Sequence, residues 1–217
     1  MLKNFLPLIA DMLALAVVML PLLLVYLQTV RYWRGEAYRT GQKWIIMLFA
    51  LYLLAVCSVV GIPSIKYIHL DFSLNLLPLL DIVDNPPGYI KNTILNIILF
   101  VPLGIFLPAV WPQYRSLRQI AAAGFGFSLS IELLQLFSWR LTDVDDLLTN
   151  TLGAVLGFYL FRWVYFVVKK QQFTETAQDG SKDAWLIWAA CLLMTIFVYP
   201  FLPEPLRNWF LYTPFWQ

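Results

Sequence analysis

The feature that most constrains the fold is a series of about six apolar runs, each close to the length that a helix needs to cross a bilayer. The runs cover about 5–30, 44–62, 92–111, 117–137, 147–168 and 184–202. A transmembrane helix takes roughly 20 mainly apolar residues. With 60% hydrophobic and 13% charged residues, the 217-residue chain could not hide this surface in water. We therefore predict an all-α fold, a polytopic membrane helix bundle with about six transmembrane helices.

The distribution of Lys and Arg predicts how the bundle is oriented, because these residues accumulate in cytoplasmic loops. Basic residues are more numerous after the first, third and fifth runs than on the opposite side. The larger set is Arg31, Arg34, Arg39, Lys43, Arg115, Arg118, Lys169, Lys170 and Lys182, and the smaller set is Lys3, Lys66, Lys91, Arg140 and Arg207. We therefore expect both termini and the segments 63–91 and 138–146 to lie outside.

The positions of the cysteines, the number of histidines and the net charge exclude or disfavour several classes of function. Cys57 and Cys191 both fall inside apolar runs, so they indicate packing residues rather than a disulfide framework. His69 is the single histidine, which excludes zinc sites built from several histidines. A net charge of +2, dispersed along the chain, does not favour nucleic acid as a partner.

Polar residues gather at helical spacing along three of the runs, at their outer ends. The three sets are Asn92 with Asn96, then Ser128 with Glu132 and Gln135, then Asp146 with Asn150, Gly153 and Gly157. Positions i, i+4 and i+7 share a helix face, and polar stripes in lipid should face the bundle interior. We predict that the three stripes meet, and that the glycine pair brings 147–168 close to 117–137.

Each of these residues also has a purely structural interpretation. Asp143, Asp145 and Asp146 stand where a helix start favours caps and negative charge. Arg140 could anchor the chain at the interface, and Asn92 and Asn150 could hydrogen-bond neighbouring helices. Glu132 is the hardest to explain in this way, since a carboxylate inside lipid costs roughly 2–3 kcal/mol or more.

The order and spacing of four blocks resemble the VanZ family of teicoplanin-resistance-associated membrane proteins. The blocks are Asn75-Leu-Leu-Pro78, the run from Asn92 through Asn96 and Pro102 to Pro108, Glu132-x-x-Gln135, and the run from Arg140 through Asp143, Asp145, Asp146 and Asn150 to Gly157. The resemblance covers roughly 44–168. Trp139 stands where relatives often have Gly.

The resemblance implies a division of the chain and a location. We expect an N-terminal transmembrane helix with a cytoplasmic loop over 1–43, and a VanZ-like core over 44–168. A cytoplasmic loop, the last transmembrane helix and a C-terminal tail would then occupy 169–217. It also implies a multi-pass protein of the bacterial inner membrane that lowers sensitivity to teicoplanin and related lipid-bearing glycopeptides.

Three functions fit these residues, and the sequence leaves them open. In the first, an outward-facing polar pocket binds or shields a cell-envelope component, such as a membrane lipid, a lipid-linked cell-wall precursor or the antibiotic. No cofactor is then needed, Arg140 contacts an anionic group, and hydrogen bonds come from side chains along the seam. The ligand-binding residues would be Asn92, Asn96, Glu132, Gln135, Arg140, Asp143, Asp145, Asp146 and Asn150.

The two alternatives give the same residues different chemistry. In an intramembrane enzyme acting on a lipid-linked phosphate, Glu132 is the candidate general acid or base. Asp143, Asp145 and Asp146 would then be candidates to hold a divalent cation. In a small proton-coupled transporter or flippase, Glu132 is the proton site and Pro21 and Pro102 break helices.

Overall fold

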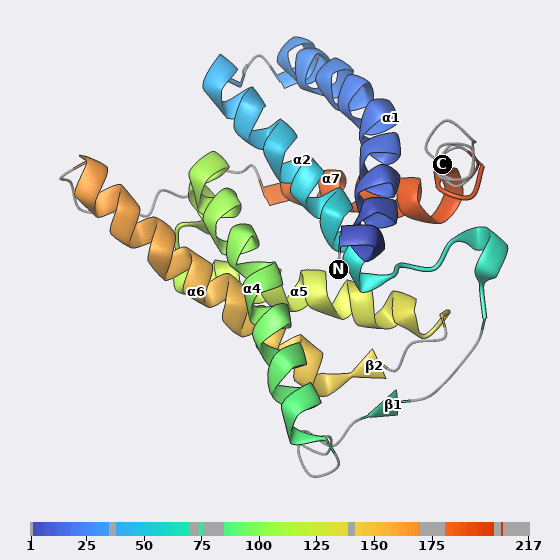
Figure 1. Cartoon of the computed structure of the whole chain (residues 1–217). Helices are drawn as coiled ribbons and strands as arrows, with labels where there is room; N and C mark the ends of the chain where they lie inside the picture. The colour runs from blue at the N-terminus through green and yellow to red at the C-terminus, as the bar shows by residue number, and fades with distance from the viewer. Residues whose placement is uncertain are drawn as a thin grey trace. The chain divides into compact units, whose positions relative to one another are not determined.

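The computed structural model of the chain is helical (Figure 1) and describes residues 2–34, 38–69, 74–75, 85–138, 142–169, 181–201 and 205. The elements are α1 (Leu2–Arg34), α2 (Thr40–Val60), η1 (Ile65–Tyr67), β1 (Leu74–Asn75), α4 (Pro86–Val110), η2 (Pro112–Tyr114), α5 (Leu117–Gln135), β2 (Thr142–Asp143), α6 (Val144–Lys169), α7 (Ser181–Leu193) and the π-helix η3 (Met194–Val198). The predicted all-α fold class is confirmed. The chain forms a terminal unit, Met1–Ile68 with Leu186–Gln217, and a central unit, His69–Trp185.

Four segments of the described chain are long and apolar enough to cross a membrane. They are Ile9–Thr29, Thr40–Tyr67, Pro86–Val110 and Val144–Val168. α5 does not reach this hydropathy, since Ser128, Glu132 and Gln135 lie on it. α7 has 13 residues before η3 continues it. Large apolar side chains are about half exposed along α4 and α6, as lipid-facing helices require. The chain is a membrane protein.

The start of α4 differs from its predicted position near residue 92. The helix begins at Pro86, and the side chain of Asn85 accepts a 3.2 Å hydrogen bond from the backbone N–H of Gly88. Proline suits the first turn of a helix, because the N–H that it lacks would have no intrahelical partner there. The Asn-Pro-Pro-Gly sequence, which indicates a turn, is therefore the N-terminal cap of α4.

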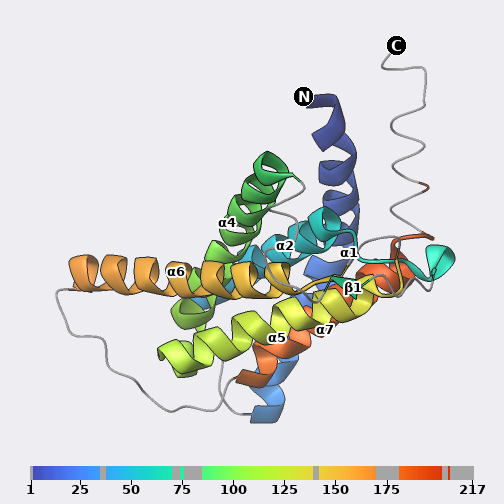
Figure 2. The same cartoon turned by 90° about the horizontal axis from the view of Figure 1, so that it is seen from below.

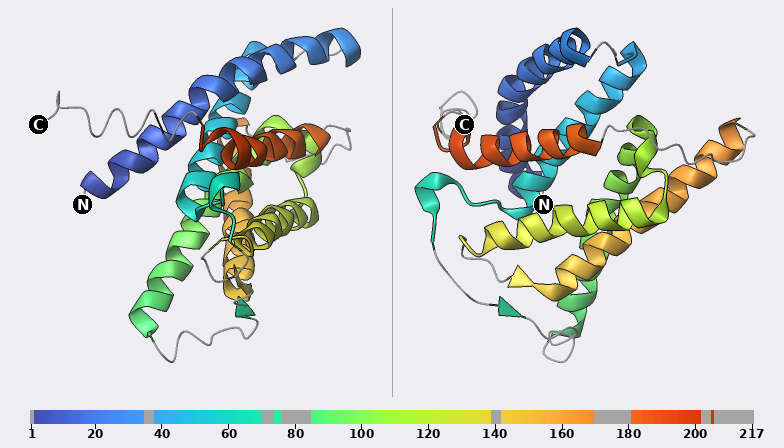
Figure 3. Two further views of the ribbon diagram at one scale, coloured as in Figure 1. Left: turned by 90° about the vertical axis from the view of Figure 1, so that its right-hand side faces the viewer. Right: turned by 180° about the vertical axis from the view of Figure 1, so that it is seen from behind.

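The terminal unit contains α1 and α2 as an antiparallel pair (Figure 3). Within this unit the Tyr199 hydroxyl donates a 2.9 Å hydrogen bond to Oδ2 of Asp11 on α1. Cys57 and Cys191 are buried free thiols. Most of the predicted polar residues lie in the other unit, so the site is described there.

In the central unit α6 packs against both α4 and α5 (Figure 2). The prediction that Gly153 and Gly157 bring α6 against α5 is wrong. A Cβ on Gly153 would meet the backbone of Ile97, and one on Gly157 would lie 3.1 Å from Cα of Gly104, so both glycines face α4. The other neighbour, α5, comes close instead at Gly124, where a Cβ would lie 2.8 Å from the Cβ of Ala154.

The prediction is wrong because the polar stripe on α6 is wide enough to face two neighbouring helices. Residues 150 and 153 differ by about 60° around a helix, because three residues fall short of one turn. Asn150 points to α5, whereas Gly153 points to α4. One stripe in the sequence therefore serves two neighbouring helices.

Candidate functional site

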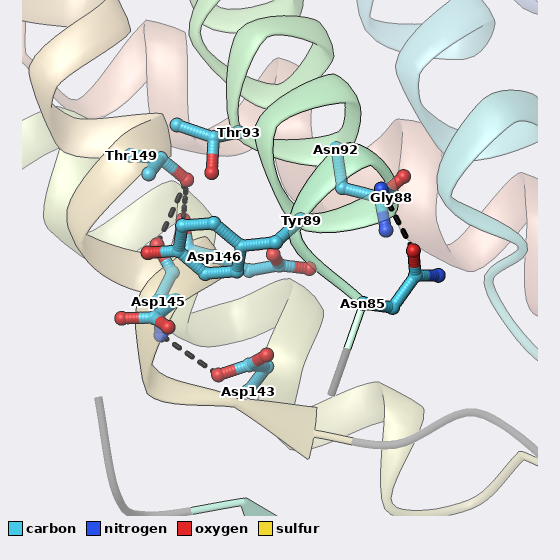
Figure 4. A pocket seen from close by; sticks show the side chains of 9 residues that line it. All are labelled: Asn85, Gly88, Tyr89, Asn92, Thr93, Asp143, Asp145, Asp146 and Thr149. Carbon is cyan, nitrogen blue, oxygen red and sulfur yellow. Dashed lines mark hydrogen bonds between the residues drawn. The ribbon is translucent and has the colours of Figure 1, made fainter. Parts of the chain in front are cut away.

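A pocket of about 230 Å³ lies where α4 and α6 begin (Figure 4). Residues from the start of α4 form one wall, and the entry and first turns of α6 form the other. The lining residues are Asn85, Gly88, Tyr89, Asn92, Thr93, Asp143, Asp145, Asp146 and Thr149. Both helices are candidate membrane spans, so the pocket lies at the N-terminal ends of two candidate spans.

Asp143 caps the helix that forms the second wall. Its Oδ1 accepts a 2.9 Å hydrogen bond from the backbone N–H of Asp145, two residues on, in the geometry of an N-cap. Asp145 and Asp146 then lie in the first turn of α6, where negative charge interacts favourably with the helix dipole. This contact matches the structural interpretation of an aspartate at this position as a helix cap, and the same cap places three carboxyl groups at the pocket.

A second contact joins the two walls. Nδ2 of Asn96 on α4 donates a 2.6 Å hydrogen bond to Oδ1 of Asp146 on α6. A bond to an ionised carboxylate is shorter and stronger than one between neutral groups. This pair orients the Asp146 carboxyl group at the pocket.

Glu132 links α5 to the wall of the pocket that α6 forms, through a hydrogen bond to the entry of α6. It is 4% exposed and lies in the last turn of α5. Its Oε2 accepts a 3.0 Å hydrogen bond from the backbone N–H of Asp143. β2, which contains Asp143, also pairs in parallel with β1, with Leu74 opposite Thr142. The entry to α6 is therefore held by a buried carboxyl group and by a short strand pair.

A polar pair is buried deeper between α5 and α6. Nδ2 of Asn150 donates a 2.9 Å hydrogen bond to Oγ of Ser128, and both side chains are buried. The other amide atom, Oδ1 of Asn150, is buried without a hydrogen-bond partner among the described residues. This pair matches the structural interpretation of Asn150 as a residue that links neighbouring helices.

The structure thus places the predicted residues in two groups. Asn92, Asp143, Asp145 and Asp146 line the pocket. Asn96, Glu132, Gln135 and Asn150 lie behind it, partly or fully buried on α4, α5 and α6. Arg140 and Pro78 lie outside the described residues, as do Trp139 and most of the segment 70–84, so the predictions made for them stay predictions.

Sequence reasoning missed Tyr89 as a pocket residue. Figure 4 shows its ring extending from α4 toward Asp145, Asp146 and Thr149 of α6. The signal was present, since Tyr89, Asn92 and Asn96 follow the i, i+3, i+7 spacing of one helix face. With a predicted helix start near 92, however, Tyr89 counted as a loop residue.

The carboxyl groups do not form a metal centre by themselves. Within the described ranges, no three or more His, Cys, Asp or Glu side chains are arranged to hold a metal ion. In Figure 4 the carboxyl groups of Asp143, Asp145 and Asp146 point in different directions. The divalent cation considered from the sequence therefore stays a prediction.

Comparison with known proteins agrees with the arrangement of these motifs. The family model described as VanZ/LLP1 matches residues 49–169, more than half of the chain. A protein named Protein VanZ from Enterococcus faecium is 32% identical over 121 residues, which cover 52% of this chain and 71% of that protein. No solved structure matches the chain. On the strength of these matches, the chain belongs to the VanZ/LLP1 family.

Proposed function

We propose that this VanZ-family membrane protein lowers the sensitivity of bacterial cells to teicoplanin and related lipoglycopeptides, by binding or shielding a cell-envelope component in the pocket between α4 and α6. The observation that carries the proposal is the position of a polar pocket at the end of two candidate spans. A component of the outer leaflet presents its polar group at this depth. The proposal places the protein in the cell membrane, with the pocket facing outside.

The groups behind the pocket support a binding role. The pairs Asn96–Asp146 and Glu132–Asp143 hold the second wall through side-chain hydrogen bonds. A site whose lining is held by such bonds binds with less loss of conformational entropy than a mobile one. The alternatives of an intramembrane enzyme and of a proton-coupled transporter or flippase remain hypotheses, as does a contact between Arg140 and an anionic group.

The test is the teicoplanin susceptibility of a sensitive bacterial host that expresses the full chain or carries an empty vector. An antibiotic with an intracellular target serves as the control drug. The proposal expects the chain to raise the inhibitory concentration of teicoplanin and to leave that of the control drug unchanged. Equal inhibitory concentrations of teicoplanin in the two strains, with the protein present in the membrane, would contradict the proposal.

A further inference from the structure

We infer that the pocket between α4 and α6 receives the headgroup of a membrane lipid, and that this headgroup is small, rich in hydrogen-bond donors and without net negative charge. Glycosyl and ammonium headgroups share this chemistry. The inference rests on the proposed function, for which it names the class of ligand. Position, size and lining chemistry each contribute to it.

The position of the pocket suits a molecule that is polar at one end and apolar at the other. Beside the lining residues, Ile90 of α4 is 52% exposed and Leu148 of α6 is 55% exposed. One turn further along each helix, Ile94 and Leu152 are also about half exposed. The polar walls therefore continue into lipid-facing apolar helix faces. A lipid can place its headgroup in the pocket and its acyl chains along these faces.

The pocket is large enough for a lipid headgroup but too small for the antibiotic. Its volume of about 230 Å³ is below the roughly 300–1,000 Å³ typical of pockets for drug-sized ligands. It offers room for a group of about one sugar ring. A whole glycopeptide is much larger, so the antibiotic is not the molecule that the pocket encloses.

The residues that line the pocket favour a ligand that donates hydrogen bonds. Ionised carboxyl groups accept hydrogen bonds and cannot donate them, and each has about four lone-pair sites. Asp143, Asp145 and Asp146 supply three such groups, and no Lys or Arg is among the described residues that line the pocket. A phosphate there would face like charge, whereas sugar hydroxyls or an ammonium group would donate to these oxygens.

Tyr89 adds an apolar surface from the opposite wall, which the start of α4 forms. Its ring lies across the pocket toward α6 (Figure 4). The face of an aromatic ring attracts an ammonium group and can also pack against the C–H groups of a sugar. The combination of carboxyl groups and one ring fits both members of the proposed class.

Binding of lipids to the purified full chain in detergent micelles tests the inference. Three lipids with the same acyl chains serve as probes: a monoglucosyl diacylglycerol, phosphatidylethanolamine and phosphatidylglycerol. We expect one of the first two to bind about tenfold or more tightly than phosphatidylglycerol. Tighter binding of the glucosyl lipid identifies a sugar as the source of the donors, and tighter binding of phosphatidylethanolamine identifies an amine.

Two pocket variants and one control variant test whether the lipid preference depends on the pocket. Asp146→Asn and Tyr89→Leu should each reduce the preference to less than about threefold, whereas Asp183→Asn, outside the pocket, should retain it. Thermal unfolding shows whether each variant is folded. If one pocket variant does not fold, the lipid preference of the other pocket variant is the test. The inference is overturned if phosphatidylglycerol binds as tightly as the other two, or if the preference survives in every folded pocket variant.

This experiment uses no antibiotic, so its failure is distinct from failure of the proposed function. A lipid preference without protection against teicoplanin would support the inference and contradict the proposed function. Protection without a lipid preference would contradict the inference alone.

Discussion

Gly104 of α4 and Gly157 of α6 lie at a point where two helix backbones meet, since a Cβ added to Gly157 would be 3.1 Å from Cα of Gly104. A Cβ on Gly104 would in turn meet the backbone of Ala154. The two walls of the pocket are the first turns of these same helices. Close packing of α4 on α6 therefore positions the pocket, although the glycines lie several turns away from it.

The first prediction concerns this packing. Gly157→Ala should destabilise the protein by about 1–3 kcal/mol, because the new methyl group meets the backbone carbonyl of Val101, which cannot rotate away. Gly41→Ala is the matched control, since a Cβ there has nothing within 4 Å and α2 gains a better helix former. Thermal unfolding in detergent measures both, and an unchanged midpoint for Gly157→Ala would refute the close approach.

The second prediction concerns the buried pair Ser128 and Asn150. Ser128→Ala removes the acceptor of the Asn150 amide, and a double-mutant cycle with Asn150→Ala should give a coupling of about 0.6–1.7 kcal/mol. Ser130→Ala is the control, because its hydroxyl donates to the backbone carbonyl of Phe127 on its own helix. If the two serine variants couple equally to Asn150, the contact between α5 and α6 is not the one described.

The third prediction separates charge from hydrogen bonding at Glu132. Glu132→Gln keeps an oxygen that can accept the N–H of Asp143, whereas Glu132→Leu removes it. Hydrogen exchange at the Asp143 amide should therefore accelerate about tenfold in the Leu variant, and much less in the Gln variant. Similar exchange in all three proteins would show that Glu132 does not hold the entry to α6.

Teicoplanin susceptibility of the same variants tests the site hypothesis for Glu132 itself. If the carboxylate charge acts on the ligand, Glu132→Gln should lose protection at equal membrane abundance. If Glu132 only supports the fold, Glu132→Gln should protect like the wild type and Glu132→Leu should not.

Hydrophobicity and helical spacing predicted the class and most of the helices, because burial in lipid requires long apolar runs. The same spacing predicted that Asn96, Glu132 and Asp146 face the bundle interior, and the structure brings their stripes together. Two features were not predictable in this way. Helix spacing identifies a face but not its neighbour, so the partner of Gly153 and Gly157 was assigned wrongly.

The pocket itself was the other feature that spacing could not predict. It requires the starts of α4 and α6 to lie at the same level, which depends on tertiary packing. Pro86 and Pro87 indicated a turn, and this concealed the first turn of α4, where Tyr89 lies. The sequence pattern that indicates this first turn is Asn85 followed by two prolines, which is a helix N-terminal cap.

The most direct test of the account compares two aspartates at the same position in two helices. Asp146 and Asp183 are each the third residue of their helix, α6 and α7, and only Asp146 lines the pocket. Replacing either by Asn removes one charge and a similar helix-dipole interaction of about 0.3–1 kcal/mol. The measurement is the inhibitory concentration of teicoplanin for hosts that contain equal membrane amounts of wild type, Asp146→Asn or Asp183→Asn. The account predicts loss of protection for Asp146→Asn alone, and equal protection by all three proteins would contradict it.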